Sequence, residues 1–222
     1  MVLIASALPA QSLTGTTGLV SIPTAEMSAD GTMAVGLNLI DRRYHDGPYT
    51  YLKHAVLVQF ASIGFLPFAE VGLRLTRRVD YNKTQALGDR MVSVRLRLVP
   101  ERTLTPAVVV GAHDLVGTRL FHSLYVVGSK GVDSLPVLGT VSAHLGYGGH
   151  VDGMTVRGYQ FQGVFGGVAV APRPWVALLV EHDARRMNGG IRLRPVHGVA
   201  VLVTLQGMDR LSGGVSYTHR LQ

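Results

Sequence analysis

The sequence predicts an all-β protein, a transmembrane antiparallel up-and-down β-barrel of about twelve strands. One reason is that apolar and polar residues alternate strictly in short segments, with charged residues in the middle of the polar face. A second reason is that the mean hydropathy reaches +0.26, although no stretch approaches the roughly 18–20 uninterrupted apolar residues of a membrane helix. A third is that short connections containing proline alternate with connections that are longer and more polar.

The clearest alternation lies in residues 70–76 and 92–98, which a polar loop joins. Val71, Leu73 and Leu75 alternate with Glu70, Gly72, Arg74 and Thr76, and Val92, Val94, Leu96 and Leu98 alternate with Ser93, Arg95 and Arg97. Strict alternation indicates a strand with one apolar and one polar face. An apolar outside with a charged inside is what a membrane barrel requires, because lipid surrounds the barrel and its lumen is polar.

Three regions follow one another along the chain. Residues 1–10 are similar to the apolar core and small-residue end of a secretory signal, so we interpret them as a signal-peptide remnant. Residues 11–31 are rich in Gly, Thr and Pro and predict an extended N-terminal lead-in that turns at Asp30 and Gly31. Residues 32–222 are predicted to form the outer-membrane barrel, with strands at 32–42, 52–62, 68–78, 89–99, 106–115, 119–129, 135–146, 159–170, 175–184, 190–195, 198–206 and 213–221.

The connections predict how the barrel is oriented. Every second connection, counted from the first strand outward, contains or adjoins proline: Pro67, Pro100 and Pro106, Pro136, Pro172 and Pro174, and Pro195. Several of the alternate connections are longer and polar, as in residues 41–54, 77–90 and 147–159. Outer-membrane barrels have short periplasmic turns and longer extracellular loops. The barrel is therefore expected to begin and end on the periplasmic side, as an even number of strands requires.

Composition narrows the possible functions. The absence of cysteine excludes disulfides, thiol catalysis and cysteine-ligated metals. A net charge of +7 and a pI near 10.0 favour acidic partners. For an envelope protein these partners are lipid phosphates or acidic glycans. Nucleic acid is not expected, because the basic residues are scattered among strands and no nucleic-acid-binding motif is present.

Charged residues on the polar strand faces are candidate lumen residues, because an arginine or lysine facing lipid costs roughly 2–4 kcal/mol. They are Glu70, Arg74, Arg95 and Arg97 in one part of the chain and Glu181, Asp183, Arg192 and Arg194 in another. One interpretation is a structural ion-pair network that fills a narrow barrel. The other is a pore lining selective for anions or acidic sugars. Barrels of about eight strands are filled by side chains and those of about 16–18 hold a channel, so twelve lies between.

Arginine pairs form a second candidate site at the long-loop side. They are Arg42 with Arg43, Arg77 with Arg78, and Arg185 with Arg186. Arginine binds phosphate through a planar bidentate fork. A basic collar at the outer leaflet is therefore suited to lipopolysaccharide phosphates or an acidic capsule. The alternative interpretation is a solvated loop base without a ligand.

The sequence gives little support for catalysis or for a cofactor. Of the nine histidines, none lies in a metalloprotease motif, and no metal or cofactor is expected. A serine hydrolase would need a serine beside a histidine in space, as Ser142 and His144 could provide. Aromatic residues near the predicted strand ends are typical of an interfacial belt: Tyr44, Tyr49, Tyr51, Tyr147, Tyr159 and Trp175.

Several segments share their order and pattern with one known family. They are TGTTGLVSIPTAEMSADGTMAVG at 14–36, FLPFAEVGLRLTRR at 65–78, GDRMVSVRLRL at 88–98, PAVVVGAHDLVGTRLFHSLYVVGSK at 106–130, and LLVEHDARRMNGGIRLRP at 178–195. Together they resemble the YjbH-like outer-membrane barrel proteins, which are linked to exopolysaccharide and capsule production. The resemblance covers most of residues 14–222. Because this chain is far shorter than the large family members, it is expected to supply one small barrel.

These observations together predict a non-enzymatic envelope protein of the bacterial outer membrane. Its expected role is in exopolysaccharide or capsule secretion, or in the assembly of surface structures. The alternatives are a passive channel for small solutes that favours anions and, less favoured, a lipid-modifying barrel enzyme. Expected partners are outer-membrane lipid or lipopolysaccharide, acidic polysaccharide and other envelope proteins.

Overall fold

The structure, a computed structural model, describes residues 10–41, 43–44, 55–79, 88–119, 121–149 and 161–221, without the side chains of Arg78 and Ser134. The strands in the described ranges are β1 (Thr32–Ile40), β2 (Val56–Gly64), β3 (Ala69–Arg78), β4 (Asp89–Val99), β5 (Ala107–Gly117), β6 (Ser123–Leu135), β7 (Gly139–Gly149), β8 (Gly163–Arg173), β9 (Val176–His182), β10 (Met187–Val196), β11 (Val199–Gln206) and β12 (Arg210–Arg220). Within these ranges, no helix has the length and apolar character needed to cross a membrane.

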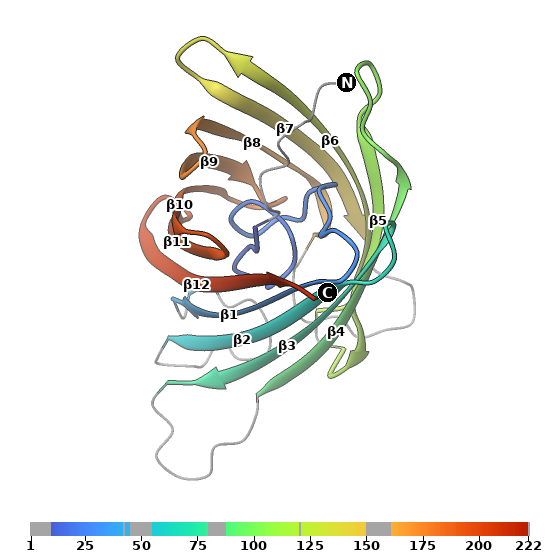
Figure 1. The fold of residues 1–222 in the computed structure, drawn as a ribbon. Helices are drawn as coiled ribbons and strands as arrows, with labels where there is room; N and C mark the ends of the chain where they lie inside the picture. The colour runs from blue at the N-terminus through green and yellow to red at the C-terminus, as the bar shows by residue number, and fades with distance from the viewer. Residues whose placement is uncertain are drawn as a thin grey trace.

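The strands form one closed barrel (Figure 1). Each strand pairs antiparallel with the strands before and after it in sequence, and β1 pairs with β12 to close the ring. The closing ladder runs from Thr32 opposite Arg220 to Leu39 opposite Gly213. The predicted all-β class, the antiparallel order and the number of strands are therefore confirmed.

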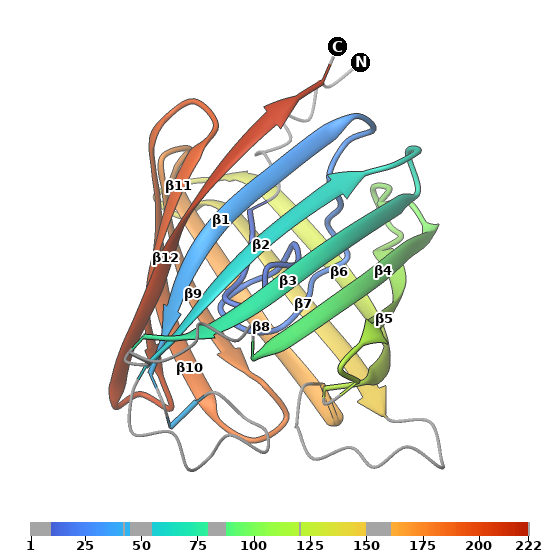
Figure 2. The same cartoon turned by 90° about the horizontal axis from the view of Figure 1, so that it is seen from below.

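The two ends of the barrel differ in the length of their connections. At one end, which we call the turn end, residues 65–68, 100–106, 136–138, 174–175 and 197–198 join the strands, and β12 finishes there (Figure 2). At the other end, which we call the loop end, the connections are residues 41–55, 79–88, 118–122, 150–162, 183–186 and 207–209. The prolines that the sequence placed at alternate connections all lie at the turn end.

Several strand boundaries differ from those predicted. The strand predicted at 119–129 begins at Ser123 instead, because Phe121 and His122 turn into the barrel and are buried. The strand predicted at 135–146 begins at Gly139, since β6 continues to Leu135 before the turn. Other shifts are β2 at 56–64, β8 at 163–173 and β12 at 210–220; residues 52–54 and 159–160 of the predicted strands lie outside the described part of the chain.

The barrel wall has an apolar outer face. In β1, Met33, Val35, Leu37 and Leu39 are exposed, and Ala34, Asn38 and Ile40 between them are buried. The same alternation exposes Val71 and Leu73 in β3 and buries Glu70, Arg74 and Thr76 on the other face of that strand, as predicted. Further outward-facing residues are Leu96, Leu98, Leu124, Val126, Leu145, Tyr147, Val164, Val168, Leu178, Val180, Ile191, Leu193, Val203, Leu205, Val215 and Tyr217.

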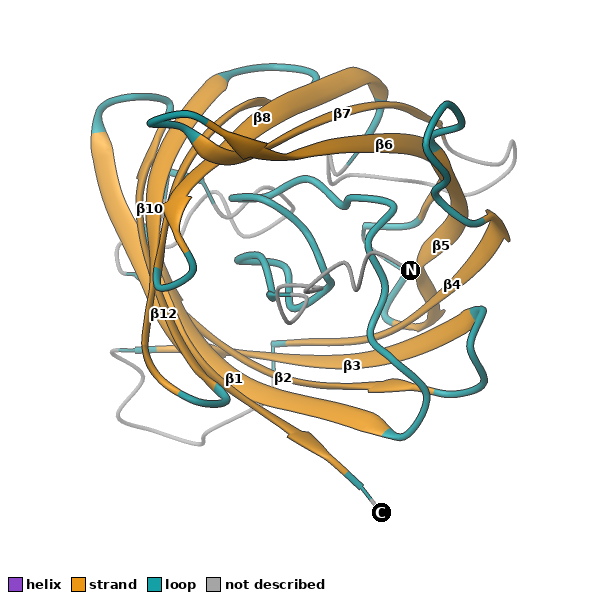
Figure 3. Ribbon diagram, turned by 45° about the horizontal axis from the view of Figure 1, so that its top comes forward, coloured by secondary structure: helices purple, strands orange, loops and turns teal. Residues whose placement is uncertain are grey.

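The inside of the barrel is a packed core. Residues 10–31, which we call the lead-in segment, lie within the ring of strands (Figure 3). Its apolar side chains are almost completely buried and join inward-facing residues of the wall in one cluster: Leu13, Leu19, Val20, Ile22, Ala25 and Met27 from the segment, and Ile40, Val58, Ala107, Val109, Tyr125, Val127, Phe161, Phe165, Ala177, Leu179 and Leu202. The extended lead-in that the sequence predicted is thus coiled inside the barrel. It ends in the predicted turn at Asp30 and Gly31, closed by the Thr32 N–H donating to the Ala29 carbonyl at 3.0 Å.

Glycines opposite aromatic rings make room for this core. Gly111 lies directly across from Tyr125 in the β5–β6 ladder, and Gly146 lies across from Phe165 in the β7–β8 ladder. In both pairs the aromatic ring occupies the space that a Cβ on the glycine would need. The rings therefore lie flat over the wall, where Tyr125, Phe161 and Phe165 contact one another edge to face or tilted.

Candidate functional site

The lead-in segment makes a compact coil that hydrogen bonds within residues 10–24 hold together. Two isolated bridges, Gln11 with Thr17 and Gly18 with Pro23, fold it back on itself. The Leu19 N–H donates to the Ile22 carbonyl at 3.0 Å and closes a tight turn. Within such a turn several backbone groups have no partner in the segment, and buried backbone groups must be paired. The barrel wall supplies these partners.

Glu181 in β9 binds the amide side of this turn. Its carboxylate accepts hydrogen bonds from the backbone N–H groups of Val20 at 2.8 Å, Ser21 at 2.8 Å and Ile22 at 3.3 Å. Successive N–H groups that point to one place form a concave site for an anion. Asn188, directly opposite Glu181 in β10, donates to the same carboxylate at 3.0 Å and holds it in place.

Arg192 in β10 binds the carbonyl side of the same turn. Its Nη2 donates to the carbonyl oxygens of Gly18 and Leu19, both at 2.7 Å, and more weakly to that of Gln11 at 3.4 Å. Arg192 is buried, as is Glu181. One acidic and one basic side chain on neighbouring strands therefore bind the two polar edges of residues 18–22.

Glu70 and Arg95 make a second anchor on the β3–β4 hairpin. They lie opposite one another in the ladder and form a buried ion pair of 2.9 Å. Glu70 also accepts hydrogen bonds from the Thr17 hydroxyl at 3.0 Å and the Ser28 N–H at 3.1 Å. Arg95 donates to the carbonyls of Thr24 and Glu26. The pair thus binds the segment on both sides of its buried Ile22–Pro23 stretch.

Uncharged residues complete the contacts. The Asn38 side chain in β1 donates to the carbonyls of Ser12 at 3.1 Å and Leu13 at 2.9 Å. Ser129 in β6 accepts from the Ala25 N–H at 2.7 Å. Sequence reasoning missed Asn38, Ser129 and Asn188. These residues could have been found by their position in the alternating pattern, because each is a polar residue on the inward face of a strand.

Arg74 occupies a different part of the lumen from the anchors. Its guanidinium lies 5.6 Å from the centre of the Phe121 ring. The acidic residues around it hold the inward-turned connection between β5 and β6: Asp114 accepts the Phe121 N–H at 2.9 Å and Asp89 accepts the Thr118 hydroxyl. Arg74 therefore contacts the connection that turns into the barrel near the loop end.

The remaining predicted lumen charges lie at the barrel ends. Arg97 and Arg194 donate to the carbonyls of Pro67 and Pro174 at the turn end. Asp183 accepts the N–H groups of Arg185 at 3.0 Å and Arg186 at 2.9 Å, so it stabilises the β9–β10 connection. The predicted set therefore divides into the lead-in anchors Glu70, Arg95, Glu181 and Arg192, the loop-end residue Arg74, and these three end residues.

The structure describes four side chains of the predicted arginine collar: Arg43, Arg77, Arg185 and Arg186. Arg42 and the side chain of Arg78 lie outside the described part of the chain. The same is true of residues 1–9 and of three aromatic residues of the predicted belt, Tyr49, Tyr51 and Tyr159. Arg43 lies 3.7 Å from Asp209, whose carboxylate also accepts the Tyr44 hydroxyl. The Arg186 guanidinium lies 4.7 Å from the centre of the Tyr44 ring. Arg77 lies opposite Leu57 in the β2–β3 ladder. Partial burial and the hydrogen bond to Asp209 raise the pKa of Tyr44, which keeps the hydroxyl protonated.

Ser142 and His144 do come together in β7. The Ser142 hydroxyl lies 3.0 Å from His144 Nε2, and the Ser129 hydroxyl lies 2.7 Å from His144 Nδ1. In a hydrolase triad a carboxylate occupies the position that Ser129 has here. Because Ser129 also binds the Ala25 N–H, this group supports the lead-in segment. Within the described ranges, no cluster of His, Asp and Glu could hold a metal ion.

The fold and the site define a closed twelve-stranded barrel whose lumen is filled by its own N-terminal segment. A sequence model of the family described as "Exopolysaccharide biosynthesis protein YbjH" matches residues 10–188. The chain therefore belongs to the YjbH family, as its motifs suggested. The match includes the lead-in segment and the strands β3, β4 and β9, which carry the anchors Glu70, Arg95 and Glu181, whereas Arg192 in β10 lies beyond it.

A curated relative is the Escherichia coli K12 protein named "Uncharacterized lipoprotein YjbH", which is 32% identical over 152 residues. The aligned region covers 64% of this chain and 20% of that protein. The chain thus spans about a fifth of the length of this relative. A closed barrel and a relative named as a lipoprotein together suggest a location in the cell envelope.

Proposed function

We propose that this chain is a sealed outer-membrane barrel that acts as a non-enzymatic component of exopolysaccharide or capsule secretion, or of surface assembly. The observation that carries the proposal is the filled lumen: the lead-in segment occupies it and is bound by Glu70, Arg95, Glu181 and Arg192. A barrel of this kind serves as a scaffold in the membrane and does not conduct.

The outer face supports a location in the membrane. It exposes a continuous set of Leu, Val and Ile side chains, and its strands have seven to thirteen residues, which suits a tilted crossing of the bilayer. The buried charges all face inward, where they avoid lipid. The family's description supplies the link to exopolysaccharide biosynthesis.

Conductance tests the sealed barrel. The full chain, reconstituted into planar bilayers of phosphatidylcholine, should give no steady ohmic current, because apolar side chains and the lead-in segment fill the lumen. Insertion is checked separately by co-flotation of the same protein with lipid vesicles. A steady current from inserted protein would favour a passive small-solute channel over the sealed scaffold.

Complementation tests the non-enzymatic role. In a strain whose exopolysaccharide output falls when the gene is deleted, the wild-type gene and Ser142→Ala should restore output equally. The reason is that Ser142 lies beside His144 in a group whose other contacts are structural. A Ser142→Ala protein that is present in the membrane at normal level but does not restore output would point to hydrolase chemistry.

A further inference from the structure

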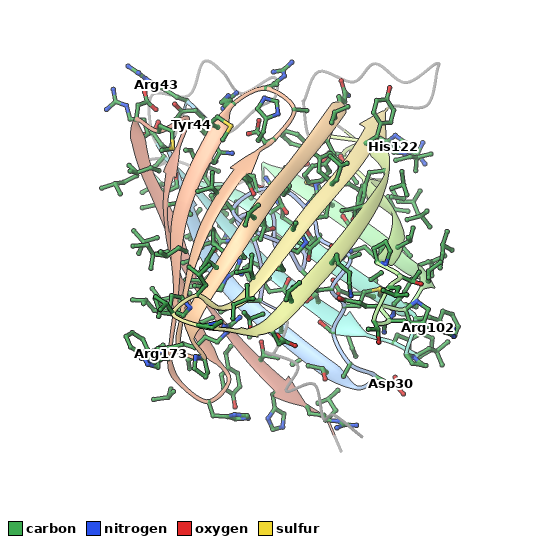
Figure 4. The ribbon with its side chains drawn as sticks, turned by 90° about the horizontal axis from the view of Figure 1, so that it is seen from above. Asp30, Arg43, Tyr44, Arg102, His122 and Arg173 are labelled. Carbon is green, nitrogen blue, oxygen red and sulfur yellow. The ribbon has the colours of Figure 1, made fainter. Side chains whose placement is uncertain are left out.

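Three connections at the loop end bring charged side chains into one group, which we call the loop-end arginine cluster. Its members are Arg43 and Tyr44 after β1, Arg186 between β9 and β10, Asp209 between β11 and β12, and Arg210 at the start of β12. Figure 4 shows Arg43 and Tyr44 at one end of the barrel, and Arg102, Arg173 and Asp30 at the other.

Asp209 organises this cluster. Its carboxylate lies 3.7 Å from Arg43 Nη1 and 3.9 Å from Arg210 Nε, and it accepts the Tyr44 hydroxyl. Tyr44 in turn lies under the Arg186 guanidinium at a distance that allows cation–π attraction. The Asp209 carboxylate thus lies near two arginines, and Arg186 adds a third guanidinium over Tyr44, so the five members of the cluster carry one negative and three positive charges. The side chains of Arg43 and Arg210 are 53% and 45% exposed, which leaves them accessible to a ligand.

The backbone beneath the cluster is well fixed. The Gly207 N–H donates to the Asn188 side chain at 2.8 Å, and the Tyr44 ring lies against Gly207 where any larger residue would clash. Asp183 binds the N–H groups of Arg185 and Arg186. The arginines are therefore held near one another before any ligand arrives, which lowers the entropic cost of binding.

The cluster also lies where the apolar wall ends. Leu39 immediately precedes Ile40 and the Arg43 connection, and Leu205 and Leu211, which face one another across the β11–β12 hairpin, flank Asp209 and Arg210. All three leucines are exposed on the outer face, and Leu211 is 70% exposed. A ligand here would meet apolar wall on one side and guanidinium groups on the other.

We infer that the loop-end arginine cluster binds the phosphate of a phosphorylated lipid headgroup in the outer leaflet. Guanidinium groups match phosphate oxygens through paired N–H donors, and the neighbouring leucines contact the acyl chains of the same molecule. A soluble acidic glycan would use the charge and leave the apolar wall without a role. The inference rests on the proposed membrane location and adds a ligand to it.

Lipid binding to the full chain in maltoside micelles, followed by native mass spectrometry, tests this inference. The probe is a diphosphorylated lipid A, and the comparison is the same glycolipid without phosphate. Wild-type protein should prefer the phosphorylated form, and Arg43→Gln with Arg210→Gln should weaken its binding by at least about tenfold, because two charge-assisted phosphate contacts are lost. Arg102→Gln with Arg173→Gln, at the turn end, removes the same charge and should leave binding unchanged.

Three results would overturn the inference: equal loss in both double variants, equal binding of the unphosphorylated lipid, or displacement of the lipid by millimolar inorganic phosphate, which would mark a site for free phosphate. Arg43→Lys with Arg210→Lys keeps the charge without the fork, so intermediate binding is expected if the fold is intact. Co-flotation with phosphatidylcholine vesicles is read in parallel. If the protein does not co-float but still prefers the phosphorylated lipid, the membrane location alone is contradicted. If it co-floats but does not prefer the phosphorylated lipid, the lipid site alone is contradicted.

Discussion

Replacing Arg95 by methionine should lower the free energy of unfolding by about 3–5 kcal/mol. The substitution leaves the Glu70 carboxylate buried without its ion-pair partner, and the carbonyls of Thr24 and Glu26 lose their donor. An uncompensated buried charge is among the most destabilising changes a single substitution can make. Urea unfolding of the vesicle-bound protein measures the loss through the fluorescence of Trp175, the single tryptophan.

Arg97→Met is the matched control for this prediction. Arg97 lies two residues further along the same inward face of β4, but it is only half-buried and donates to the Pro67 carbonyl at the turn end. Its loss should cost less than about 1 kcal/mol. The double variant Glu70→Gln with Arg95→Met should recover part of the stability, because no charge then remains unpaired. Equal destabilisation by the two single variants would show that Arg95 is no more important than an end residue.

Glu181→Ala should release the turn at residues 18–22 from the wall without unfolding the barrel. Three backbone N–H groups lose their acceptor, and each unmet buried group costs about 1–3 kcal/mol. The local stability of the turn should therefore fall by at least about 3 kcal/mol, which corresponds to a roughly hundredfold faster amide exchange. Hydrogen exchange at Val20, Ser21 and Ile22, read by mass spectrometry of peptides, measures this effect.

Two further substitutions bracket the expected result. His182→Ala changes the next residue, which is exposed on the outer face, and should leave exchange in residues 18–22 unchanged. Glu181→Gln keeps one acceptor oxygen and should lie between the wild type and Glu181→Ala. If exchange in this turn remained as slow in Glu181→Ala as in the wild type, the segment would not depend on this anchor.

The wall of the barrel was largely predictable from the sequence. Alternation over residues 70–76 and 92–98 placed the charges of β3 and β4 on the correct face, and proline distinguished the two ends. Boundaries were less accurate where loop residues are themselves apolar. Phe121 is a residue type that is common in strands, but here it lies in a connection and its side chain is buried inside the barrel.

The position of the lead-in segment was not predictable. Residues 13–22 have no periodicity, because a coil held by its backbone places no demand on the spacing of its side chains. The sequence predicted different partners for the charged residues that bind this segment. In the ion-pair interpretation, Glu181 and Arg192 were expected to pair with other side chains in the lumen. They contact backbone groups instead, and Val20 lies 161 residues before Glu181. Backbone partners at such a separation leave no pattern in a single sequence.

The same separation determines the order in which the lumen can be filled. The lead-in segment is synthesised before every strand, whereas two of its four charged anchors, Glu181 and Arg192, belong to β9 and β10. The segment can therefore make these contacts only after most of the chain has been synthesised. Contacts between residues so distant in sequence form slowly during folding. Until β9 and β10 have been added, Leu19 and Ile22 remain exposed to water and can associate with apolar surfaces of other chains. We therefore expect a folding intermediate that contains β1–β8 to depend on chaperones that shield this segment.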